Sequence, residues 1–348
     1  MSALRSRTAP IENLLGRSTL LRSLGLVIVV GVVLYVVSGQ LGAYNQSQLA
    51  IGLYYFAVLA GLTMLIGSSG QVSLGHGALM AVGAYTVILL IGKEGWALLP
   101  ALVAAVVVTT AVGIPMGIAA SRLRGPYLAG ATLAFAVGLP ALANQFPVTF
   151  GGSNGLVINP PLPPSWLGAT FSQEEWWAWI CGLGALLVLF VVYNLSHSGL
   201  GRSLRAVRDD EIAASLCGLR VPRLQSLAFV ISAACAGLAG GLFVVVLQLA
   251  TPESFPLQLS LALLTGVVVG GLGSLWGAAF GAALLTLLPG WSNDLSSSLS
   301  LSQNVQGNLP FAIYGAVLIV VMLVWPSGIS GGLRALAKAV STTRRRDL

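Results

Sequence analysis

Charged side chains are scarce in this sequence, and long stretches have none at all. Asp, Glu, Lys and Arg make up 8% of the 348 residues, whereas soluble domains carry about 25%. Residues 23–92, 125–173 and 295–333 contain no charged side chain, and each stretch is long enough for at least one membrane crossing of about 20 residues. With 56% hydrophobic residues, a soluble fold could not bury this much apolar surface. The sequence therefore excludes a soluble domain and indicates an integral membrane protein.

Signals of catalysis, metal binding and ion coupling are missing as well. There is no Gly-x-x-x-x-Gly-Lys-Ser/Thr phosphate loop and no His-Glu-x-x-His motif, and the two histidines, His76 and His197, lie far apart. The three cysteines show no metal-ligand spacing and predict no disulfide framework. The apolar segments also lack the charged pairs that proton-coupled carriers place inside the membrane. We therefore expect a chain that is not an enzyme, binds no metal or cofactor itself, and takes its energy from a separate partner.

Ten apolar segments are expected to enter the membrane. Because unpaired backbone groups are costly in lipid, and these runs lack the polar alternation of a β-barrel, each segment is predicted to be helical. The first segment follows several arginines, as in a secretory signal peptide, but without a convincing cleavage site it is interpreted as a retained helix. The predicted fold is an all-α polytopic membrane bundle with some broken or partly spanning helices. The segments lie near residues 24–38, 49–66, 72–91, 97–120, 127–143, 176–195, 224–249, 257–270, 276–290 and 311–325.

The positions of the basic residues predict the side of the membrane on which each loop lies. Cytoplasmic loops collect Lys and Arg, and starting inside places all 17 basic residues except Lys93 on the cytoplasmic side. Both termini are therefore expected in the cytoplasm. Because the basic residues flank apolar helices and do not interleave with aromatic residues on a soluble face, no nucleic-acid partner is expected. The predicted organisation is a basic N-terminal segment (1–23), a transmembrane domain (24–325) with a cytoplasmic loop at 197–223, and a basic cytoplasmic tail (326–348).

The loop between His197 and Pro222 is the longest predicted cytoplasmic segment between helices and has the densest charge of these segments. Asp209 and Asp210 favour a helix start, and Gly218 can end a helix. One or two short amphipathic helices outside the bilayer are therefore predicted. Such helices can dock into a groove of a soluble partner or lie on lipid headgroups, and the spacing does not distinguish these alternatives. The apolar residues at roughly helical spacing are Leu204, Val207, Ile212, Leu216 and Leu219.

A polar, glycine-rich stretch from Gly70 to Ala78 separates two apolar segments without any charge. Its glycines would break a helix, and broken helices within membranes often line solute paths. One interpretation is therefore a solute path. The other is a glycine-mediated helix crossing in which the histidine is satisfied by a neighbour. The candidate path residues are Gln71, Ser73, Gly75 and His76.

Several stretches in order resemble the permeases of branched-chain amino-acid ABC importers, specifically the LivM-like branch. The resemblance covers roughly residues 49–333. It implies a second homologous permease subunit, two cytoplasmic ATP-binding subunits that use ATP and Mg, an extracytoplasmic solute-binding protein, surrounding membrane lipids, and a prokaryotic inner (plasma) membrane. It also implies import by alternating access. The stretches that carry it are residues 70–78 with 83–85, 122–128, 151–155, 201–214 and 270–277.

The resemblance also assigns roles to two loops. Glu211, Ala213, Ala214 and Gly218 match the family's Glu-Ala-Ala and downstream-Gly pattern, with Ile212 inserted after the glutamate. The predicted ATPase-coupling residues are Arg202, Arg205, Arg208, Glu211, Ile212, Ala213, Ala214 and Gly218. The predicted loop facing the binding protein is Gly151, Gly152, Ser153, Asn154 and Gly155.

The transported solute is less closely specified by the sequence. Branched-chain amino acids are expected, but urea, short amides and aromatic acids are alternatives because permeases of this family serve more than one class of solute. An ion-coupled carrier is a different kind of alternative, and the lack of intramembrane charge counts against it. A membrane scaffold without a transport path is harder to exclude from composition.

Overall fold

The computed structural model describes residues 19–123, 125–159, 162–164 and 171–298, together with scattered positions between 309 and 332. Within these residues the chain is almost entirely helical. Eight helices are long and apolar enough to cross a membrane, and a ninth apolar helix is shorter. The predicted all-α polytopic membrane bundle is confirmed. The tenth expected segment, 311–325, lies largely outside the described residues, as do most of the two terminal segments.

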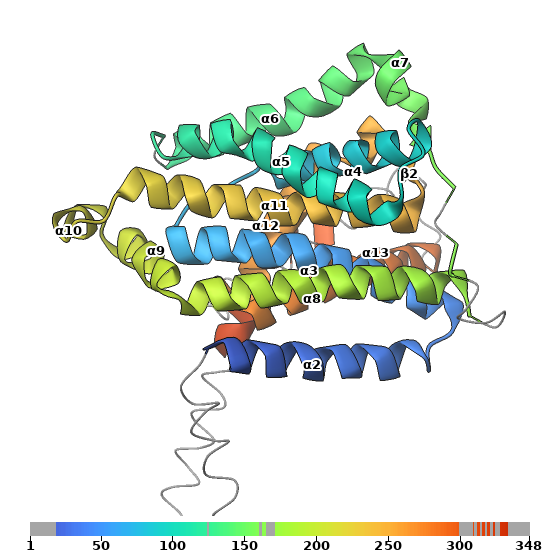
Figure 1. Cartoon of the computed structure of the whole chain (residues 1–348), viewed down its shortest axis with the longest axis horizontal. Coiled ribbons are helices and arrows are strands. Elements are labelled where there is room, and N and C mark those ends of the chain that lie inside the picture. Colours follow the sequence, from blue (N-terminus) through green and yellow to red (C-terminus); the bar gives the residue numbers. More distant parts are fainter. Residues whose placement is uncertain are drawn as a thin grey trace, which may run out of the picture.

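The membrane helices run side by side as one bundle (Figure 1). Helix α4 has 17 residues, and α12 has 14 but forms a 19-residue span when counted from Pro252. The segment expected at 72–91 is helical only from His76, because the glycine-rich residues 70–75 before it are not helical. The membrane helices are α2 (Thr19–Ser38), α3 (Ala43–Ser69), α4 (His76–Gly92), α5 (Leu98–Ala120), α6 (Pro126–Gln145), α8 (Gln173–His197), α11 (Val221–Leu247), α12 (Leu257–Gly270) and α13 (Leu275–Ser298).

Helix α11 is the centre of the bundle and packs against α3, α4 and α5. Of the most apolar window of α11, 78% is buried, compared with 6% for α2, which packs mainly against α8 at the edge. The composition of α11 explains this position, because small residues along it let several helices approach at once. A Cβ at Gly83 of α4 would overlap the carbonyl of Gly237 in α11, and a Cβ at Gly240 of α11 would overlap the carbonyl of Met80 in α4, so both helices need glycine where they cross.

Two Gly-x-x-x-Gly motifs, Gly113–Gly117 in α5 and Gly237–Gly241 in α11, meet across the interface between these helices. In α5, a Cβ at Gly113 would press on the side chain of Ala233, and in α11 a Cβ at Gly237 would press on Thr109. Gly-x-x-x-Gly spacing is common in membrane helices and is a weak signal for any single pair. Here both motifs mark the same contact, which fixes α5 against the central helix.

The two ends of the bundle carry different short elements (Figure 1). Helices α9 (Gly199–Asp209) and α10 (Glu211–Leu216) lie at one end with the basic loop, so this end is cytoplasmic by the distribution of positive charge. At the other end, strand β1 (Leu156–Val157) pairs antiparallel with β2 (Leu249–Ala250). Short helices complete the outer end, namely α7 (Pro147–Phe150), η1 (Gly152–Asn154) and η3 (Pro252–Ser254).

Candidate functional site

The glycine-rich stretch is a non-helical passage of the chain, residues 70–75, that connects α3 to α4. Helix α3 ends at Gly70, whose φ of 73° lies in the left-handed region and whose N–H bonds the carbonyl of Ile66. Helix α4 does not begin until His76. Gln71 and Ser73 are 5% and 1% exposed, whereas Val72 between them is 40% exposed, so alternate side chains of this stretch face the protein interior. Irregular backbone at membrane depth is tolerated only where protein buries it or where it lines a cavity.

Hydroxyl groups from neighbouring helices satisfy the backbone of this passage. The N–H of Leu74 donates to Thr132 Oγ1 of α6 at 3.0 Å. The N–H of Gly77, in the unpaired first turn of α4, donates to Ser260 Oγ of α12 at 3.0 Å. Since the first N–H groups of a helix have no partner within it, such hydroxyls replace the missing turn. Residues 70–77 therefore form a hydrogen-bonded joint that ties α4 to α6 and α12.

His76 is fully buried and holds the joint to the central helix. Its Nδ1 lies 3.0 Å from Ser73 Oγ, and its Nε2 lies 2.7 Å from Ser232 Oγ of α11. Both ring nitrogens are thus engaged, while Gly75 packs against the backbone of Thr132. This geometry is that of the helix-crossing interpretation for these residues, and their predicted role along a solute path stays a prediction.

Gln71 differs from its neighbours because neither its amide oxygen nor its amide nitrogen has a hydrogen-bond partner. Gln71 is one of the residues that line a cavity of about 570 Å³ near the cytoplasmic end, between residues 70–75, the α5–α6 turn and the start of α11, although its amide atoms are themselves buried. Glu211 and Gln225 line the same cavity, and Gln225 Nε2 donates to Glu211 Oε1 at 2.8 Å. The structure thus joins two regions that the sequence analysis treated separately. Gln225 was missed, and the only sequence signal for it is a polar residue early in an apolar run.

Helix α9 turns its apolar face into the bundle, as its amphipathic spacing predicts. Leu204 and Val207 are buried, and the Ser198 hydroxyl caps the helix start. Arg208 reaches across to α3, where its Nη1 donates to the carbonyl of Gly67 at 2.6 Å. The last carbonyls of a helix are unpaired and favour a cation, so this contact stabilises the end of α3.

The remaining arginines of the predicted coupling set make local contacts within the α8–α9 turn. Arg205 Nη1 donates to the carbonyl of Ser196 at 2.9 Å, and Arg202 Nη1 donates to the carbonyl of His197 at 3.4 Å. Both contacts close the α8–α9 turn. These two side chains therefore shape the loop locally, whereas the third arginine of the set connects it to α3.

Helix α10 projects beyond the ends of the membrane helices (Figure 1). Asp210 caps it by accepting hydrogen bonds from the N–H groups of Ile212 and Ala213, which confirms the predicted helix start. Ala214 is buried, but Ile212 and Leu216 are 74% and 84% exposed. One helical turn separates these two, so they form a single apolar face. The helix is followed by a left-handed residue, Gly218, with a φ of 83°.

Comparison with known proteins places these features in one family. The family described as the branched-chain amino acid transport system permease component matches residues 45–324. The permease protein LivM of Salmonella typhimurium is 34% identical over 304 residues, which cover 80% of this chain and 68% of that protein. LivH of Escherichia coli is 28% identical over 81% of this chain and 92% of its own, and BraD of Pseudomonas aeruginosa is 27% identical over 81% and 93%. No solved structure matches.

The chain belongs to this permease family. It is a multi-pass protein of the plasma membrane, in agreement with its apolar helices.

The outer loop predicted to face a binding protein packs closely against β2 in this permease. Gly151, Gly152 and Gly155 all have positive φ, at 80°, 57° and 70°. A Cβ at Gly155 would press on the carbonyl of Ala250, so the loop approaches β2 closely. The side chains between the glycines, at positions 153 and 154, are exposed. The loop therefore presents a fixed polar tip at the outer end.

Lys93 anchors the neighbouring turn of the permease. Its Nζ donates to the carbonyls of Val148 and Thr149 at 3.2 and 3.1 Å. These carbonyls belong to α7, so the lysine caps that short helix. This contact accounts for the one basic residue that the charge distribution places at the outer end.

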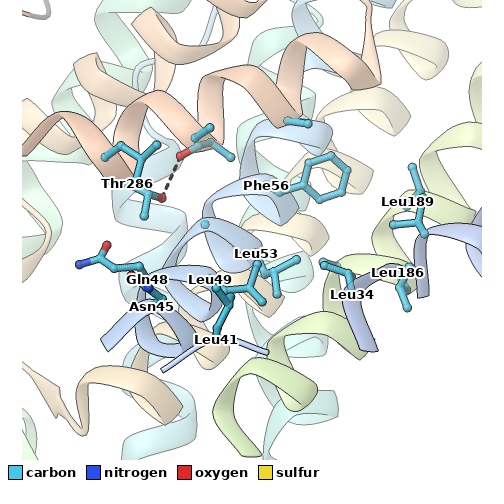
Figure 2. Close-up of a pocket in the computed structure, with 17 residues that line it drawn as sticks. Leu34, Leu41, Asn45, Gln48, Leu49, Leu53, Phe56, Leu186, Leu189 and Thr286 are labelled. Atoms are coloured by element: carbon cyan, nitrogen blue, oxygen red, sulfur yellow. Dashed lines mark hydrogen bonds between the residues drawn. The ribbon is translucent and has the colours of Figure 1, made fainter. Parts of the chain in front are cut away.

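A second cavity, of about 510 Å³, opens between α2, α3, α8 and α13 (Figure 2). Its lining is aliphatic and aromatic apart from Asn45, Gln48 and Thr286, and the hydroxyl of Thr286 is already bonded to the carbonyl of Ala282. Such a lining suits an acyl chain better than an amino acid, which needs partners for two charges. This groove is separate from the passage at residues 70–75. Among the described residues, no group of three or more His, Cys, Asp or Glu could hold a metal ion.

Proposed function

We propose that this permease imports a branched-chain amino acid, and that partner ATPases drive it by docking on α10. The protruding apolar face of α10 carries this proposal. Ile212 and Leu216 are largely exposed at the cytoplasmic end, where an apolar pair favours a partner groove. The names of the relatives LivM, LivH and BraD all state branched-chain amino acid transport.

Energy for import comes from the partners in this proposal. The sequence has no phosphate loop, so ATP and Mg²⁺ are used by two cytoplasmic ATP-binding subunits. When these subunits close, α10 and α9 move, and Arg208 passes the movement to the end of α3. The permease then changes the side to which its path opens. Such coupling requires that ATP favour one of two states, which is the general condition for a driven transition.

Two further partners complete the proposed importer. The chain is similar both to LivM and to LivH, two differently named permeases of one bacterial transport system, which supports pairing with a second homologous permease. At the outer face, the exposed tip of Ser153 and Asn154 is the proposed contact for a solute-binding protein. The close packing of Gly155 against Ala250 supports this role, because it holds the tip at the outer surface.

Reconstitution tests this function directly. The permease is purified with its genomic neighbours, placed in liposomes, and assayed for ATP-dependent uptake of labelled leucine, urea and a short amide. Leucine uptake that requires ATP and the binding protein is the expected result. Uptake of urea or the amide alone would keep the importer and change its solute. An intact assembly without ATP-dependent uptake would contradict the proposal and favour an ion-coupled carrier or a scaffold.

A further inference from the structure

We infer that a groove between α2, α3, α8 and α13 binds an anionic phospholipid of the cytoplasmic leaflet. The groove consists of two cavities, namely the apolar one of about 510 Å³ described above and another of about 570 Å³ nearer the cytoplasmic end. Val30, Phe56, Leu189 and Ala279 line both, so the two cavities adjoin (Figure 2). We call the whole depression the lipid groove. The inference depends neither on the transported solute nor on where the ATPases dock.

The apolar lining of the groove runs from the cytoplasmic end toward the middle of the membrane. His197, at the end of α8, lines the cytoplasmic cavity, and Leu189 of the same helix lines both cavities. At about 1.5 Å per residue, these two positions are about 12 Å apart along the helix. One leaflet of the hydrocarbon core is about 15 Å thick, and the apolar lining continues past Leu189 to Leu34 and Leu53. The groove is therefore long enough for an acyl chain whose headgroup lies at the cytoplasmic surface.

The charge of the groove is positive at this cytoplasmic end. Arg205 lines the cytoplasmic cavity, and neither cavity is lined by an Asp or Glu. Its guanidinium donates one N–H to the carbonyl of Ser196 at 2.9 Å, and a guanidinium has five N–H donors, so four are left for a ligand. Among the described residues, no carboxylate forms an ion pair with Arg205. Since the planar guanidinium matches the oxygens of a phosphate group, a phosphate is the anion that this arginine favours.

Aromatic side chains place Arg205 at the depth of the lipid headgroups. Trp276, in the first turn of α13, lines the same cavity and is 65% exposed. Tyr193 also lines it and stacks on His197, with 4.2 Å between the ring centroids. Trp and Tyr are enriched at the membrane–water interface, and basic pockets between membrane helices on the cytoplasmic side bind anionic headgroups. A soluble phosphate compound would use the arginine alone, whereas a phospholipid uses both the arginine and the apolar lining.

The test uses the full-length permease, purified with its partner subunits in detergent and freed of native lipid, and measures equilibrium binding of labelled phosphatidylglycerol. Arg205→Gln is expected to weaken binding roughly 10- to 100-fold, because hydrogen bonds between charged groups are lost. Arg202→Gln is the matched control, since Arg202 also closes the α8–α9 turn through one carbonyl but lines neither cavity. In the wild type, phosphatidylcholine with the same acyl chains has no net charge and should bind about fivefold more weakly or worse.

A second variant tests the apolar lining and leaves Arg205 in place. Ala279 is exposed and lines both cavities, so Ala279→Phe fills the groove where the cavities adjoin without entering the core. It should weaken phosphatidylglycerol binding roughly tenfold or more, because the ring excludes several methylene groups of the acyl chain. Ala134→Phe, at an exposed position of α6 that lines neither cavity, is its control.

Three results would overturn the inference. The first is wild-type affinity in both Arg205→Gln and Ala279→Phe, and the second is an equal loss of affinity in the two control variants. The third is displacement of the labelled lipid by glycerol 3-phosphate at concentrations similar to those of the lipid, which would assign the site to a soluble phosphate compound. Thermal melting provides an independent readout, since phosphatidylglycerol should raise the melting temperature of the wild type and of Arg202→Gln more than that of Arg205→Gln.

Discussion

Replacing Leu216 by serine is expected to weaken ATPase docking without unfolding the permease. Leu216 is the most exposed residue of the apolar face of α10, with 84% of its surface accessible. Asp210 and the buried Ala214 hold the helix in place, and neither contact involves the leucine side chain. The substitution therefore removes apolar surface from the docking face and leaves the packing of the bundle intact.

The magnitude follows from the surface that docking can bury. Fully burying a leucine side chain contributes about 1.5–3 kcal/mol, and 84% of that surface is still available, which leaves about 1.3–2.5 kcal/mol. Since about 1.4 kcal/mol corresponds to a tenfold change in affinity, Leu216→Ser should raise the dissociation constant roughly 10- to 60-fold. A substitution in a face that lies on lipid headgroups would leave this constant unchanged.

The assay is a binding titration of the purified ATPase subunits against the permease in nanodiscs. Val148→Ser is the matched control, because Val148 is 92% exposed but lies at the outer end of the bundle. Thermal stability is measured for both variants to show that they fold. Wild-type ATPase affinity for Leu216→Ser would refute the docking argument and support the alternative in which α10 lies on the membrane surface.

Three other changes have expected outcomes. Arg208→Met removes the hydrogen bond to the Gly67 carbonyl and should lower uptake per ATP hydrolysed. Its stability loss should be only about 1 kcal/mol, because the arginine side chain is 41% exposed. The same uptake per ATP as in the wild type would contradict this prediction. Gly83→Ala should destabilise by about 1–3 kcal/mol or more at a helix crossing, whereas Gly138→Ala, in open space, should not, as judged by thermal melting. His76→Leu removes the partner of the Ser232 hydroxyl and one of two partners of the Ser73 hydroxyl, which still accepts from the Gly75 N–H, and should cost about 1–3 kcal/mol. An unchanged melting temperature would refute its role in the joint.

Much of the fold could be predicted because the membrane imposes simple rules. Apolar runs must be helical in lipid, and the distribution of arginines orients them, so the bundle and its two ends followed from composition. The start of α4 at His76 is a finer detail. Glycines at 70 and 75 predicted a break but not its limits, because the limits depend on hydroxyls from α6 and α12 that lie far away in the sequence.

The candidate site was less predictable, because its contacts also join residues that lie far apart in the sequence. Periodicity predicted that Leu204 and Val207 face inward, since local spacing determines the buried side of an amphipathic helix. It could not show that Arg208 crosses to Gly67 while Arg202 closes a local turn. Flexible arginine side chains choose partners by tertiary proximity. The cavity that Gln71 and Gln225 both line likewise depends on tertiary packing without a local sequence signal.

The contact between α9 and α3 explains how a small movement outside the membrane can act inside it. Arg208 bonds the carbonyl of Gly67, and its stem lies beside Gly70, where a side chain in place of the glycine hydrogen would contact it at 3.1 Å. If α9 shifts, the guanidinium must either leave this carbonyl or carry the end of α3 with it. The left-handed φ of Gly70 is a conformation that only glycine adopts readily, so the chain can bend there with little strain elsewhere. Gln71 follows immediately, and movement of α3 therefore acts directly on the cavity lined by Gln71, Glu211 and Gln225. The proposed coupling thus requires only adjacent packed contacts, with no long pathway through the bundle.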